Sequence, residues 1–134
     1  MIEALKPKRK SIKGFRDLEV YQGLYGAAIL VMQKIIPKLP EEEKYGLRSQ
    51  LNRACKSPCA LIAEGFAKKH QPRSFKKYLD DAIGECNEMI THLSFCQDLY
   101  SKSVDAGSCD ELIDIYDKSS RQLFKLGKAW KNFK

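Results

Sequence analysis

The feature that most constrains the fold is a recurrence of apolar residues every three or four positions. Between Leu18 and Ile35 the steps from one apolar position to the next are 3, 4, 3, 4 and 3. This spacing returns each apolar side chain to the same face of an α-helix. The stripe passes through Tyr21, Tyr25, Ala28 and Met32. Three later stretches repeat the pattern, and none alternates with the period of two that strands show.

Turn signals separate the four stretches. The first ends at the sequence IPKLP, because proline lacks a backbone donor and disfavours helix in the residue before it. We expect the second helix to open at PEEEK and to stop near Gly65. The fourth should begin at Ser108, with Glu111 completing a capping box. The expected helices are residues 18–35, 40–65, 72–100 and 108–130.

Four amphipathic helices joined by short loops predict an all-α fold, an antiparallel up-down-up-down four-helix bundle. We assign residues 15–134 to this bundle domain and residues 1–14 to a flexible basic arm. No apolar run is long enough to cross a membrane, and no secretion signal follows the basic start. We therefore expect a cytoplasmic protein that does not bind membranes.

The net charge of +7 is segregated along the chain. Six basic residues and one acid lie in residues 1–16, five basic residues without an acid in 68–77, and four without an acid in 125–134. The rest of the chain is net acidic. Such segregation favours an extended anionic partner, nucleic acid before a membrane, and a solvated basic surface is the alternative interpretation.

The candidate nucleic-acid-binding residues form three groups. The first, expected at one turn between helices, is Lys68, Lys69, Arg73, Lys76 and Lys77. The second, on the preceding helix, is Arg48, Arg53 and Lys56, of which the two arginines are alternatively paired with acids inside the assembly. The third, beside Trp130, is Lys125, Lys128 and Lys131. Few aromatics are expected at the surface, so backbone and shape recognition is favoured over base stacking. As the partner, structured RNA is favoured over DNA.

The segment CKSPCA, residues 55–60, raises the question of a metal or redox site. Cys55 and Cys59 share a helix face, as do His92 and Cys96, but neither pair has the short-loop spacing of a structural zinc site. Phosphate-binding loops and the paired E-x-x-H motifs of di-iron bundles are absent from the sequence. We expect cysteines used as small core residues, a helix bent at Pro58, and no enzyme activity, metal or cofactor.

Four motifs carry a family resemblance: FRDLEVYQ (15–22), YGLRSQLNRA (45–54), IAEGF (62–66) and AIGECNEM (82–89). Together, over about residues 15–130, they resemble the bacterial four-helix-bundle family first known as 23S ribosomal RNA intervening-sequence proteins. The accessory variability proteins of diversity-generating retroelements are similar to that family. The family usually has the sequence S-I-P-S-N-I-A-E-G. In this chain the proline comes one position earlier, and Leu61 replaces the asparagine.

The resemblance implies an antiparallel bundle that assembles into a barrel-like homopentamer without known catalytic activity. For the retroelement branch it implies binding of nucleic acid and of a reverse transcriptase. The leading hypothesis is therefore a non-catalytic, oligomeric nucleic-acid-binding adaptor, with a reverse transcriptase as the candidate protein partner. The alternative is a structural protein–protein interaction module with no direct nucleic-acid role.

Overall fold

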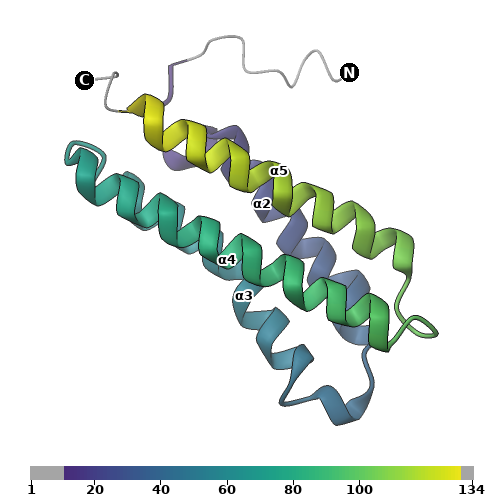
Figure 1. Cartoon of the computed structure of the whole chain (residues 1–134). Helices are drawn as coiled ribbons and strands as arrows, with labels where there is room; N and C mark the ends of the chain where they lie inside the picture. Colours follow the sequence, from purple (N-terminus) through teal and green to yellow (C-terminus); the bar gives the residue numbers. More distant parts are fainter. Residues whose placement is uncertain (1–10, 131–134) are drawn as a thin grey trace.

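Four helices make up most of residues 11–130, the part of the chain that the computed structural model describes, and this part contains no strand (Figure 1). The all-helical prediction is therefore confirmed for these residues. Residues 1–10 of the predicted arm lie outside this range. The elements in order are η1 (Phe15–Asp17), α2 (Glu19–Leu30), the π-helical turn η2 (Val31–Ile35), the 3₁₀ turns η3 (Ile36–Lys38) and η4 (Glu41–Glu43), α3 (Leu47–Phe66), α4 (Pro72–Leu99) and α5 (Ala106–Trp130).

Each of the four helices packs against two neighbours. Helix α2 contacts α3 and α5, while α4 lies between α3 and α5 (Figure 1). Within the described part, the diagonal pairs α2–α4 and α3–α5 have no Cα atoms within 8 Å of each other. This arrangement is that of a four-helix bundle. No helix within residues 11–130 has the length and hydropathy that a membrane crossing requires.

The core runs along the centre of the bundle and draws on all four helices. Its largest fully buried side chains include Leu24 from α2, Ile62 from α3, Phe75 from α4 and Tyr116 from α5. Burial of such side chains from water is the main favourable contribution to folding. All five cysteines are also buried in this core as free thiols, as predicted for small apolar residues.

The second helix begins later than predicted. The acids after Pro40 form the separate turn η4, and α3 starts only at Leu47. The carboxylate of Glu43 folds back and accepts a hydrogen bond from the Leu47 N–H at 2.9 Å. A side chain at Gly46 would collide with that carboxylate, so this glycine permits the cap. Helix α3 then continues without interruption through the buried Pro58.

The start of the fourth helix also differs from the prediction. Helix α5 begins at Ala106, and Asp105 rather than Ser108 caps it. The Asp105 carboxylate accepts hydrogen bonds from the Ser108 N–H and from the Ser108 hydroxyl, both at 2.9 Å. Ser108 therefore sits at the third helical position, where its N–H is one of the donors that an N-cap residue satisfies.

The buried face of α2 matches the predicted stripe only in part, because Leu18, Ala28 and Ile35 of the stripe are buried but Tyr25 and Met32 are not. Val20, Leu24 and Ala27 face the core, whereas Tyr25 is 55% exposed and Met32, in η2, is 38% exposed. The stretch from 20 to 33 contains no charged residue, so apolar side chains surround the helix and its periodicity does not select one face. The bundle buries one side and leaves apolar side chains on the other.

Candidate nucleic-acid interface

The first predicted group lies where α3 ends and α4 begins, and we call it the basic turn: Lys68, Lys69, Arg73, Lys76 and Lys77. Its backbone is fixed by hydrogen bonds from the Lys68 N–H to the Gly65 carbonyl at 2.8 Å and from the Gln71 N–H to the Lys68 carbonyl at 2.9 Å. Pro72 then opens α4 at a first-turn position, where its missing N–H is not needed. Lys68 is half-buried and the other four members are exposed.

Gly65 brings the two helices close together just before the basic turn. Helix α3 ends at Phe66, one residue beyond Gly65, so the predicted stop near Gly65 is confirmed. A Cβ atom built on Gly65 would lie 2.6 Å from Cβ of Tyr78 and 3.3 Å from Cδ1 of Phe75. The glycine is therefore required by the close approach of α4, and this approach sets the position of the turn.

Tyr78 links the turn to both helices. Its hydroxyl donates to Glu64 Oε2 at 3.1 Å and accepts a hydrogen bond from Lys68 Nζ at 3.2 Å. The Lys68 ammonium also lies 5.2 Å from the centre of the Tyr78 ring. Lys69 makes a similar cation–π contact, 4.7 Å from the centre of the Phe66 ring. Aromatic side chains thus hold both lysines near the surface without neutralising them.

Two members of the basic turn are paired with acids. Lys76 lies 2.8 Å from Asp80, and Lys77 lies 3.3 Å from Asp81, both at helical spacing of four. Such exposed pairs contribute little to stability, but they offset part of the local charge. Within residues 11–130, the other three members, Lys68, Lys69 and Arg73, form no ion pair.

The end of α5 lies against the basic turn. The indole Nε1 of Trp130 donates to the main-chain oxygen of Lys69 at 2.9 Å. Lys128 lines the same surface pocket as Arg73 and Lys76, so the structure brings part of the third predicted group to the first. Lys125 is exposed one turn earlier on α5, and Lys131 lies outside the described residues. The sequence could not reveal this junction, because it depends on how far α5 extends along α4.

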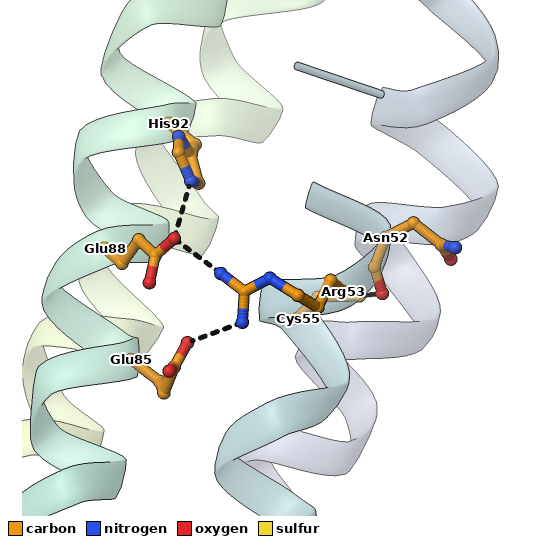
Figure 2. A network of polar contacts seen from close by, with 6 residues as sticks. All are labelled: Asn52, Arg53, Cys55, Glu85, Glu88 and His92. Carbon is orange, nitrogen blue, oxygen red and sulfur yellow. Dashed lines mark hydrogen bonds and ion pairs between the residues drawn. The ribbon is translucent and has the colours of Figure 1, made fainter. Parts of the chain in front are cut away.

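The second predicted group lies elsewhere. Figure 2 shows Arg53 of α3 reaching across to α4, with its guanidinium 2.7 Å from Glu88 and 3.6 Å from Glu85. Glu88 Oε2 also lies within hydrogen-bonding distance of His92 Nε2, at 3.2 Å. Arg53 is thirteen residues before the end of α3, roughly 20 Å away along the helix. This guanidinium therefore belongs to an interhelical network, as the alternative interpretation proposed.

The acids in this network have unequal surroundings. Burial raises the pKa of Glu85, and the neighbouring Glu88 raises it further, while Arg53 opposes both effects.

The other two members of the second group are not part of this network. Arg48 pairs with Glu41 of η4 at 3.2 Å. Lys56 is exposed on α3 and has neither an ion pair nor a side-chain hydrogen bond in the described part. The structure does not bring the second group to the basic turn.

The thiols are placed for packing. Burial raises the pKa of Cys59 to about 11 and the pKa of Cys86 to about 12, so both stay protonated at neutral pH. A thiol is a weak nucleophile and a weak metal ligand until it loses its proton. Within residues 11–130, no three side chains of His, Cys, Asp or Glu gather closely enough to hold a metal ion.

Comparison with known proteins identifies the family. The sequence profile of a family described as 23S rRNA-intervening sequence protein matches residues 16–125, more than half of the chain. Neither the curated proteins nor the solved structures give a significant match. The family match confirms the resemblance carried by the four sequence motifs. The chain therefore belongs to the 23S rRNA-intervening sequence protein family.

Proposed function

We propose that this protein is a non-catalytic, oligomeric adaptor that binds nucleic acid through the basic turn. The observation that carries the proposal is the set of three cations, Lys68, Lys69 and Arg73, which project at one end of the bundle without an acidic partner in the described part. Phosphate contacts supply most of the non-specific affinity of such surfaces. Structured RNA is the favoured partner, and the setting is the cytoplasm.

Self-assembly is the second part of the proposal. Helix α2 and the turn that follows it leave four large apolar side chains exposed: Tyr25, Ile29, Leu30 and Met32. An uncharged, apolar helix face is a surface that a subunit interface can bury. In this proposal the helices form an antiparallel up-down-up-down bundle and five copies form a ring, as the family resemblance implies. A ring would repeat the basic turn, and weak phosphate contacts would add as avidity.

The nucleic-acid proposal is tested by a salt series. Purified, nuclease-treated protein is titrated into a structured RNA and a matched DNA duplex, alongside a Lys68→Ala/Lys69→Ala/Arg73→Ala variant. Trp130 bonds to the main chain of Lys69, so alanine leaves that contact in place. If these side chains each neutralise one phosphate, the slope of log K against log salt falls by about 2 to 3 for each subunit engaged.

The matched control removes the same charge elsewhere, with Lys34→Ala/Lys38→Ala/Lys102→Ala, three exposed lysines remote from the basic turn in sequence. The control should bind like the wild type. Equal losses in both triple variants would mean that only total charge matters. Negligible binding near physiological salt by an intact oligomer would refute the adaptor and favour the structural protein–protein interaction module.

Assembly is tested separately, by native mass spectrometry and light scattering. An Ile29→Glu/Met32→Glu variant should yield monomers that keep their helical circular dichroism, whereas Gln50→Glu, on the exposed side of α3, should not change the mass. A wild type that is monomeric at micromolar concentration would refute assembly. Co-purification with a reverse transcriptase encoded beside the gene would support the retroelement branch of the proposal.

A further inference from the structure

A pocket of about 240 Å³ opens between the first turn of α4 and the last turn of α5. It brings together aromatic rings and several cations. Its principal lining residues are Arg73, Phe75, Lys76, Gly127, Lys128 and Trp130. Typical small-molecule sites are somewhat larger, so this volume suits one flat ring system and an attached anion.

The aromatic wall is held rigidly. The Trp130 indole donates to the Lys69 carbonyl at 2.9 Å, and its ring meets Phe75 edge to face, with centroids 4.9 Å apart. A second edge contact joins it to Phe66 at 6.0 Å. Because the indole is already fixed, a ligand that stacks on it loses little side-chain freedom on binding.

The cations around this wall keep a net positive charge. Lys76 is paired with Asp80, but Arg73 has no ion pair in the described part of the chain. The Lys128 ammonium lies 5.5 Å from the centre of the Phe124 ring, a contact that leaves its charge uncompensated. Three cations and one acid therefore leave the rim attractive to a phosphate group, either the singly charged diester within an RNA chain or the monoester of a free nucleotide.

We infer that this pocket receives one unpaired nucleotide, with its base against Trp130 and its phosphate between Arg73 and Lys128. The inference rests on the proposed nucleic-acid binding and adds base stacking to it. A base within a duplex is covered on both faces, so the nucleotide must come from a loop or an end of a structured RNA. A free mononucleotide presents the same chemistry, and the test separates the two sources.

Gly127 lines the pocket, so a larger side chain at this position can fill it. A Cβ atom there would lie 3.6 Å from Leu79 Cδ1 and 3.8 Å from Lys76 Cγ, which are ordinary contacts. Gly127→Ala should therefore fold normally and keep the pocket, whereas Gly127→Met should fill it without removing any charge. The two variants form a matched pair, and thermal unfolding checks that both are folded.

Trp130 is the only tryptophan in the sequence, so its fluorescence reports on the pocket directly. Adenosine monophosphate should quench it in the wild type and in Gly127→Ala but not in Gly127→Met, and inorganic phosphate at equal ionic strength should not quench it. A hairpin RNA with an unpaired loop should bind Gly127→Met roughly 5- to 100-fold more weakly than Gly127→Ala, with an unchanged salt slope.

The outcomes separate this inference from the proposed function. Equal, salt-dependent RNA binding by Gly127→Met and Gly127→Ala would refute nucleotide binding in the pocket. It would still agree with the proposed adaptor function. If the wild type binds no RNA, the proposed adaptor function is refuted. The fluorescence titration with adenosine monophosphate then tests on its own whether the pocket binds a nucleotide. Quenching that Gly127→Met abolishes would then identify a site for free nucleotides, and an absence of quenching would overturn it.

Discussion

Replacing Gly65 with alanine tests how closely α3 and α4 pack. The new methyl carbon would lie 2.6 Å from Cβ of Tyr78, about 1 Å inside the optimal separation of two carbons. Tyr78 Cβ is attached to the backbone of α4 and cannot rotate away, so the helices must move apart. Overpacking of this kind costs about 1–3 kcal/mol, and the better helix propensity of alanine offsets about 1 kcal/mol.

The matched control is Gly84→Ala in the middle of α4, where an added Cβ meets nothing within 4 Å. This variant should gain about 0.5–1 kcal/mol from helix propensity alone. The free energies of unfolding of the two variants should therefore differ by about 1–3 kcal/mol, and their Tm values by about 4–12 °C for a chain of this size. Both are measured by thermal unfolding at one protein concentration, because the proposed self-assembly would make the Tm depend on concentration. Equal Tm values would refute the argument that Gly65 is required by close approach.

Three further predictions concern the cap, the acid response and the thiols. Asp105→Ala should lower the free energy of unfolding by about 1 kcal/mol in urea titrations, because α5 loses its N-cap, and an Asp98→Ala control should change it little. Hydrogen bonds from the N–H of Leu47 and the hydroxyl of Tyr100 hold the pKa of Glu43 below its usual range. The stability from these bonds is present above the usual carboxyl pKa and is lost as pH falls through the lowered value. Glu43→Gln should therefore flatten the loss of stability between about pH 5 and pH 3, and a parallel loss in both proteins would contradict this role. Finally, an aromatic disulfide reagent at pH 8 should label none of the five buried thiols in the native protein and all five in urea. Rapid native labelling would mean that the core opens.

Periodicity predicted the number of helices and most of their limits. Helix α4 illustrates this, because Pro72 opens it and its apolar residues at helical spacing, such as Phe75 and Leu79, are buried. In α2 the pattern was right for Leu18, Ala28 and Ile35 and wrong for Tyr25 and Met32, because apolar residues surround this helix and several faces satisfy the same spacing. The pattern also failed at helix starts such as Leu47, where the cap comes from Glu43 folding back rather than from a side chain in the adjacent position.

Only part of the candidate site could be predicted from the sequence. The five cations of the basic turn lie within ten residues of the sequence, 68–77, and Lys76 and Asp80 are four residues apart, the spacing at which helical side chains pair. The meeting of Lys128 with Arg73 depends instead on the stagger of α4 and α5, which loop lengths do not fix. The placement of Gly127 in the same pocket depends on that stagger as well, and no local signal marks it.

The hydrogen bond from Trp130 to the Lys69 carbonyl couples two segments that are 61 residues apart. Terminal turns of helices ordinarily open at low free energy, but opening this one breaks that bond and draws the indole away from Phe66 and Phe75. The basic turn and the end of α5 therefore form one cooperative unit. The fraction of molecules in which this unit is closed scales the apparent affinity of any ligand that needs both segments. Substitutions that only loosen the last turn of α5 would thus weaken binding without contacting the ligand.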